Sequence, residues 1–138
     1  MSFLLDTMVV SELAKHHRDR SLAAWLAGQD RRALHLSVVT LGEIEKGLAL
    51  LRRRDNERAD ALAGWLDELV GRFRDRLLDV DARIARRWGR LAASAGHAGA
   101  DLLIAATALE HDLTVVTRNV RHFAATGVRL VDPYGAFG

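Results

Sequence analysis

Residues 3–10 read Phe-Leu-Leu-Asp-Thr-Met-Val-Val, a short apolar run followed at once by a carboxylate and a hydroxyl. From Met8 to Lys15 the apolar residues then have helical spacing, so the stretch predicts a strand that ends at Leu5 and passes into a helix. A carboxylate at such an exit lies at the edge where open α/β sheets bind ligands. Asp6 is therefore the first candidate site residue.

The same alternation of strand and helix continues along the chain. Strands are predicted at 3–5, 34–37, 77–78, 114–117 and 129–131, and helices at 8–15, 21–27, 41–51, 57–73, around 84–91, 101–111 and 120–124. Strands separated by helices indicate a parallel sheet, because parallel neighbours need a crossover connection. The sequence thus predicts one α/β domain over residues 1–138, with helices on both faces of a parallel sheet of four to five strands.

Composition limits the classes of protein that remain. The chain has 138 residues, 49% hydrophobic and 28% charged, which is ordinary for a globular domain. No apolar stretch approaches the ~20 residues of a membrane span, and no basic region precedes the first apolar run. Cysteine is absent, which excludes disulfides and thiolate metal sites. We therefore expect a cytoplasmic protein.

Arginine dominates the basic residues, although the net charge is only +2. Three clusters stand out, at Arg52–Arg54, Arg72–Arg76 and Arg83–Arg90. They are interpreted first as solvated helix faces paired with nearby acids, and second as a surface that contacts phosphates.

Two further acids occupy positions like that of Asp6. Glu43 follows the strand predicted at 34–37, and Asp101 begins the almost wholly apolar run 102–109. Each has a structural alternative. Asp6 could cap the first helix, Thr40 and Glu43 could form a capping box, and Asp101 could interact with a helix dipole.

Capping does not explain why the three acids share one end of the sheet. Carboxylates brought together repel one another unless a cation lies between them. Hard divalent cations prefer oxygen ligands, which suggests Mg²⁺, with Mn²⁺ as a substitute. Such an ion activates water and offsets charge on a phosphate, so phosphoryl chemistry is the natural use.

Three motifs resemble those of PIN-domain ribonucleases, specifically the VapC and FitB-like toxins of bacterial toxin–antitoxin pairs. The motifs are Leu4-Leu5-Asp6-Thr7-Met8-Val9-Val10-Ser11-Glu12-Leu13, Ser37-Val38-Val39-Thr40-Leu41-Gly42-Glu43-Ile44, and Ala100-Asp101 through Ala108 followed by Leu113-Thr114-Val115-Val116-Thr117-Arg118-Asn119. They occur in family order and span nearly the whole chain. The resemblance implies a PIN-like three-layer α/β/α domain.

The resemblance also implies roles for individual residues. Asp6, Glu43 and Asp101 would be the catalytic and metal-binding acids, with Asp6 and Asp101 the nearest ligands. The supporting residues would be Thr7, Thr117, Arg118 and Asn119.

Two departures concern this site. Many relatives have asparagine where this chain has Met8. Many also carry a fourth acid where this chain offers Asn119 and His122, and the absence of that acid favours one metal ion per subunit.

Two functions follow as hypotheses. The first is a Mg²⁺-dependent endoribonuclease toxin that acts on single-stranded or looped RNA, whose unpaired bases can be read. The second, motivated by Met8 and the missing fourth acid, is a weakly active or inactive PIN-fold module that acts through partner binding. By resemblance, the partners would be a cognate VapB-like antitoxin and a second copy of the chain. Trp65, at the margin of the stripe Leu62, Leu66, Leu69, is the residue predicted to be exposed for contact with the antitoxin.

Overall fold

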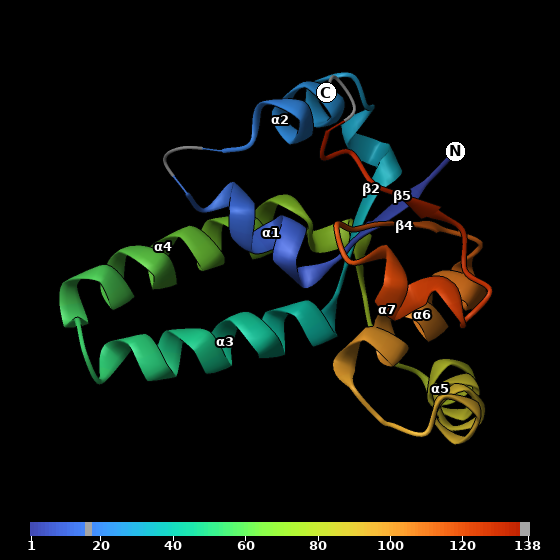
Figure 1. The fold of residues 1–138 in the computed structure, drawn as a ribbon. Helices are drawn as coiled ribbons and strands as arrows, with labels where there is room; N and C mark the ends of the chain where they lie inside the picture. Colours follow the sequence, from blue (N-terminus) through green and yellow to red (C-terminus); the bar gives the residue numbers. More distant parts are fainter. Residues whose placement is uncertain (16–17, 136–138) are drawn as a thin grey trace.

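The computed structural model describes residues 1–15 and 18–135, and its centre is a parallel five-stranded sheet with the order β3-β2-β1-β4-β5 (Figure 1). The strands are β1 (Phe3–Leu5), β2 (Leu34–Ser37), β3 (Leu77–Leu78), β4 (Thr114–Val116) and β5 (Leu130–Val131). The first strand of the chain therefore lies in the middle of the sheet, hydrogen-bonded to β2 on one side and to β4 on the other. The predicted parallel sheet is confirmed.

Helices cover both faces of this sheet, as predicted (Figure 1). The α-helices are α1 (Thr7–Leu13), α2 (Arg20–Ala27), α3 (Val38–Arg52), α4 (Asn56–Arg72), α5 (Ala82–Ala95), α6 (Ala100–His111) and α7 (Val120–Ala124). Short 3-10 turns at Arg31–Ala33 and Arg74–Arg76 precede β2 and β3 and were not predicted. The boundaries of most other elements lie within one to three residues of the predicted ones.

Alternating side chains of the strands build two separate cores. Leu5 points into a cluster shared with α1, α2, α3 and α4, whereas Leu4 points into a cluster shared with α6 and α7. Val116 and Val115 of β4 divide in the same way between the two clusters. Because successive residues of a strand face opposite sides of a sheet, three residues of β1 anchor both helical layers.

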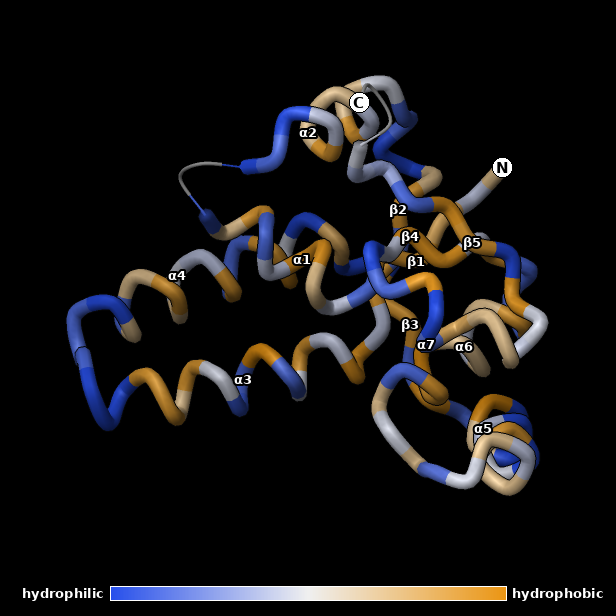
Figure 2. The backbone as a smooth tube through the Cα atoms, in the orientation of Figure 1, coloured by the Kyte–Doolittle hydropathy of each residue, from blue (hydrophilic) through white to orange (hydrophobic). Residues whose placement is uncertain are grey.

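Helices α3 and α4 form a hairpin that extends away from the sheet (Figure 1). The turn between them is the most hydrophilic part of the arm, as Figure 2 shows in blue. Leu66 and Leu69 of α4 are buried in the first core, and Trp65 is half-buried and packs against the same core. The predicted exposure of Trp65 is therefore only partial.

Helix α3 begins earlier than predicted. Ser37 caps it through a hydrogen bond from the Val39 amide to the Ser37 hydroxyl, at 3.0 Å. Thr40 and Glu43 consequently lie inside the helix, and the capping box proposed for them is wrong. The cause is local, since Ser37 is also a good capping residue and is the last residue of β2, immediately before the helix.

Helix α6 is buried from several sides, as the apolar run predicted. Its residues Leu102, Ile104, Ala105, Ala106, Thr107 and Ala108 are all buried. Even so, no helix in the parts of the chain that the structure describes is both long and apolar enough to cross a membrane. The helix holds Asp101 rigidly at its first turn.

Two glycines should respond in opposite ways to alanine. Gly64 lies in the middle of α4 with open space around its Cα, so Gly64→Ala should raise stability by about 0.5–1 kcal/mol, or roughly 2–4 °C in Tm. Gly96 ends α5 at φ 77°, where an L side chain is strained, so Gly96→Ala should lower Tm. Thermal unfolding followed by circular dichroism tests both, and a matching sign for the two variants would contradict the assigned conformations.

Candidate metal-dependent active site

The candidate site lies at the carboxyl edge of the sheet, where the strand order changes direction. The chain runs from β1 outward to β2 and β3, and then crosses to β4 and β5 on the other side of β1. The helices that follow β1 and β4 pack into the two different cores, so the chain leaves these neighbouring strands toward opposite faces, and such a point is the usual ligand position in open α/β sheets. Asp6 follows β1 and Thr117 follows β4 at this point.

Asp6 is buried and firmly held, with only 6% of its surface exposed. Its Oδ1 accepts a hydrogen bond from the Thr7 amide at 2.8 Å, and its Oδ2 accepts one from the Thr117 hydroxyl at 2.8 Å. Asp6 is thus the cap of α1, as the structural alternative expected. The bond from Thr117 goes beyond capping, because it fixes the carboxylate against the neighbouring strand.

Glu43 reaches the same region from α3 through a pair of hydroxyls. The Thr7 hydroxyl donates to Glu43 Oε1 at 2.6 Å and lies 2.9 Å from the Thr40 hydroxyl. Since Thr7 has one hydroxyl hydrogen, donation to Glu43 makes Thr40 the donor to Thr7. Glu43 is exposed, so its carboxylate is oriented by this chain and faces solvent.

Asp101 is the second residue of α6 and is half-buried. The chain passes very close to it at Gly99, where an added Cβ would lie only 2.7 Å from Asp101 Oδ1. Glycine is thus needed at this position to leave the carboxylate in place. Asp101 lies in the first turn of the helix, the position from which its structural alternative expected an interaction with the helix dipole.

The charges of these acids act on one another. Burial raises the pKa of Asp6 above its usual value, and the nearby negative charges of Glu43 and Asp101 raise it further. The hydrogen bonds from Thr117 and Thr7 oppose this effect. Within residues 1–15 and 18–135, neither Asp6, Glu43 nor Asp101 forms an ion pair with a basic side chain.

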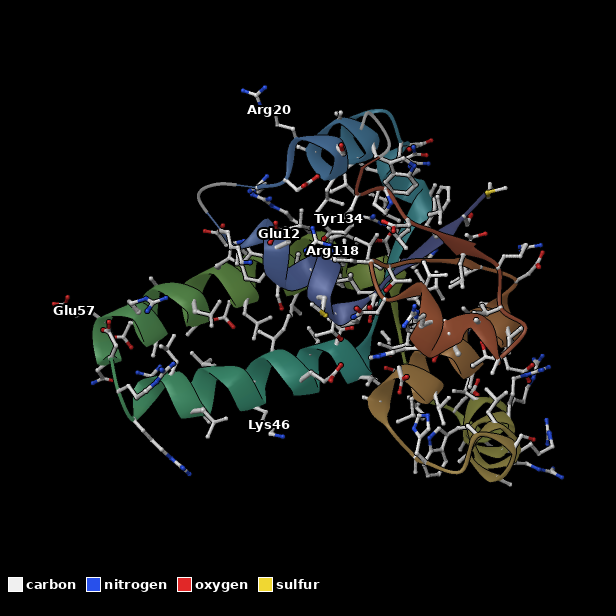
Figure 3. All side chains as sticks on the ribbon, in the orientation of Figure 1. Glu12, Arg20, Lys46, Glu57, Arg118 and Tyr134 are labelled. Carbon is white, nitrogen blue, oxygen red and sulfur yellow. The ribbon has the colours of Figure 1, made fainter. Side chains whose placement is uncertain are left out.

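The remaining predicted site residues divide into two groups. The Asn119 amide donates to the Thr117 hydroxyl at 2.9 Å, so both belong to the shell around Asp6. The Asn119 side-chain nitrogen lies 2.8 Å from the Met8 sulfur, which places these two departures from the family pattern against each other. Arg118 turns away, with its guanidinium 4.0 Å from the centre of the Tyr134 ring (Figure 3).

Sequence reasoning missed Thr40 as part of the site because the capping box explained it in another way. Its spacing was the available signal, since residues three apart on a helix lie on one face and Glu43 is three residues later. The structure places Thr40 fully buried beneath the Thr7 hydroxyl.

The donors gathered here are hard oxygens, the kind that Mg²⁺ binds. In the described ranges, no three acidic or histidine side chains stand close enough to enclose an ion by themselves. Mg²⁺ commonly takes only one or two carboxylates directly and keeps several waters, so this arrangement fits an open site.

The arginine clusters behave mainly as solvated, paired helix faces. Arg52 pairs with Asp60 at 2.8 Å, and Arg87 pairs with Glu110 at 2.8 Å. Arg76 donates to the backbone carbonyl of Leu34 at 2.8 Å. At least one member of each cluster is therefore committed to the fold, in line with the first interpretation.

Curated proteins with known names match nearly the whole chain. It is 33% identical to the plasmid stability protein StbB of Pseudomonas syringae, over 96% of this chain and 99% of that protein. It is 34% identical to a VapC ribonuclease of Sinorhizobium fredii, over 95% and 96% of the two chains. It is 32% identical to toxin FitB of Neisseria gonorrhoeae, over 95% and 97%.

Solved structures agree with these relatives. The crystal structure of FitAcB from Neisseria gonorrhoeae superposes with a TM-score of 0.85 at 33% identity, covering 95% of this chain and 97% of that one. A structure of FitAB bound to a DNA fragment has a TM-score of 0.83 at 31% identity, over 95% and 94% of the chains. The family model for the PIN domain matches residues 3–128. Together with the five-stranded parallel sheet, these matches show that the chain belongs to the PIN-domain family.

Proposed function

We propose that the protein is a Mg²⁺-dependent endoribonuclease and the toxin of a toxin–antitoxin pair. The observation that carries this proposal is the buried Asp6 carboxylate, beside two more acids and without a basic partner among the described residues. A buried charge of this kind is costly unless something compensates it, and a bound cation would do so. Relatives named VapC ribonuclease and toxin FitB support the activity and the biological role.

Asp6 and Asp101 are the residues that would hold the ion, directly or through water. Each oxygen of Asp6 accepts one hydrogen bond from the protein, which leaves each oxygen with a lone pair to offer. Thr117 and the Thr7 amide would keep the carboxylate ionised and oriented while it does so. A bound Mg²⁺ would supply activation of water and compensation of negative charge on the phosphate.

Glu43 has a separate role in the proposal. Because Thr7 occupies its Oε1, the carboxylate is fixed in orientation and Oε2 remains for the attacking water. Glu43 would accept a proton from that water as the water oxygen bonds to the phosphorus of an RNA phosphodiester, which is general-base catalysis. The P–O bond to the leaving ribose oxygen would break, and that oxygen would take a proton from solvent. Thr40 would act only by positioning Thr7 and, through it, Glu43.

The proposed partners follow from the relatives and from the proposed substrate. A VapB-like antitoxin would bind the protein and lie across the edge of the sheet that carries the three acids, and the toxin would form a homodimer. Structures that contain FitB together with FitA support a complex of this kind. The protein would act in the cytoplasm, because its RNA substrate and an antitoxin encoded beside it would both be found there.

A catalytically weak module remains the competing function, and one contact favours it. The Asn119 side chain rests against the Met8 sulfur, so a neutral amide stands where many relatives carry a fourth acid. The two functions differ in whether cleavage depends on the acids and on the ion.

Asp6→Asn and Asp101→Asn should each reduce RNA cleavage about 100-fold or more, since removal of one charged contact to a transition state has effects of that size. Both variants should also lose growth arrest on expression. Asp67→Asn, on the exposed side of α4, is the matched control and should leave cleavage unchanged. Cleavage is measured on labelled single-stranded RNA with Mg²⁺ or EDTA, and undiminished toxicity of both variants would refute the nuclease function.

The stability of the apo protein should depend on the ionisation of Asp6. Its pKa is raised in the folded state, so the folded protein binds this proton more tightly than the unfolded chain does. The free energy of unfolding therefore falls as pH rises through the folded-state pKa, and below about pH 4 the penalty disappears. Asp6→Asn should consequently have a higher Tm than the wild type at neutral pH in EDTA, and the difference should shrink on acidification.

Millimolar Mg²⁺ should raise the Tm of the wild type, because an ion that binds only the folded state stabilises it. Asp6→Asn should show no such rise, whereas Asp67→Asn should behave like the wild type. Calorimetry with and without the ion provides both comparisons. An equal response of wild type and Asp6→Asn to Mg²⁺ would show that Asp6 does not hold the ion.

A further inference from the structure

A pocket of about 720 Å³ opens beside Asp101, between α5, α6 and α7. Figure 1 shows α7 next to α6, with the loop from α5 to α6 passing nearby. Asp101 lines this pocket, so the pocket adjoins the candidate metal centre. A molecule bound in this pocket would lie next to the phosphodiester on which a metal ion at Asp101 would act.

The walls of the pocket combine an apolar surface with nitrogen donors. Leu91 and Ala95 contribute apolar surface, and His97, Arg121 and His122 contribute the nitrogen-bearing side chains. Its volume is within the range of roughly 300–1,000 Å³ that is usual for small-molecule sites. A nucleotide would match this composition, with its flat base against the apolar side chains and its phosphate beside the nitrogen-bearing ones.

Arg121 is the arginine that lines the pocket and is available to a ligand. It is exposed on α7, and among the ion pairs of the described ranges none includes it. This separates it from Arg87 and Arg52, whose charges are paired with acids of the fold. Arginine binds phosphate oxygens with two parallel donors, which gives orientation as well as attraction.

His97 is held in a defined orientation. Its Nδ1 accepts a hydrogen bond from the Gly99 amide at 3.2 Å, so in the neutral ring Nε2 carries the hydrogen and is a donor. The same glycine allows the close approach of Asp101. The loop between α5 and α6 thus fixes both Asp101, a candidate metal ligand, and His97, a wall of the pocket.

We propose that this pocket binds the RNA nucleotide adjacent to the cleaved phosphodiester, with Arg121 contacting its phosphate and Leu91 and Ala95 contacting its base. The inference rests on the proposed nuclease function and extends it by assigning a subsite for the substrate. The contacts to the nucleotide come from Arg121 and the apolar side chains and not from Asp101, so the subsite contributes to RNA binding and not to activation of water.

Arg121→Ala tests the subsite, with Arg20→Ala as the control. Arg20 is an exposed arginine on α2, remote from the pocket, and its loss changes the net charge equally (Figure 3). Binding is measured by fluorescence anisotropy with labelled ten-nucleotide oligomers of U, A and C in EDTA. Arg121→Ala should weaken binding about tenfold, the effect of losing one good contact, and Arg20→Ala less than twofold.

Steady-state cleavage adds a second readout. Arg121→Ala should raise KM about tenfold with kcat nearly unchanged, the pattern of lost uniform binding. Its affinity for Mn²⁺, measured by calorimetric titration, should equal that of the wild type. A matched Tm for the two arginine variants and the wild type shows that folding is not the cause.

Three results would overturn the assignment. If Arg121→Ala and Arg20→Ala weakened RNA binding equally, the effect would come from the change in overall charge. Wild-type RNA binding by Arg121→Ala, with loss of the coexpressed antitoxin during purification, would assign the pocket to a protein segment. If the wild type neither bound nor cleaved RNA, the proposed function would fail along with its subsite, whereas an active wild type with an unaffected Arg121→Ala would remove the subsite alone.

Discussion

The Asp6 carboxylate is buried at the carboxyl ends of the neighbouring strands β1 and β4, and the groups around it offset part of the free-energy cost of that burial. A hydroxyl from the neighbouring strand exit and the first amide of α1 each stabilise one of its oxygens. These two hydrogen bonds favour the charged form, while burial and two nearby acids disfavour it. The balance leaves a carboxylate with a raised pKa and an unmet need for positive charge, which is the physical basis of the proposed metal site.

The two other acids reach this point from opposite faces of the sheet. Glu43 belongs to α3, which packs through Ile44 into the first core, and Asp101 belongs to α6, which packs through Ile104 into the second. Both cores depend on alternate residues of the same short strand, β1. A change that displaced one helical layer would therefore separate the acids, so the fold and the site share one set of contacts.

The sequence was sufficient for the parallel sheet, the buried helix α6 and the positions of the acids, because these depend on periodicity and on residues next to strand ends. It was insufficient where two local signals competed. Ser37 and Thr40 are both good caps, and only the tertiary structure shows that Ser37 begins α3. The family resemblance named Thr117 as a supporting residue, but neither its hydrogen bond to Asp6 nor the pocket beside Asp101 could be predicted, because residues distant in sequence create them.

A crystal of the protein soaked in Mn²⁺ and measured at an anomalous wavelength tests the central claim most directly. The account predicts one strong anomalous peak at the carboxyl edge of the sheet, about 2 Å from a carboxylate oxygen of Asp6 or Asp101, with waters completing the shell. A peak elsewhere, or no peak beside these acids at millimolar Mn²⁺ with Asp6 still buried and unpaired, would contradict it.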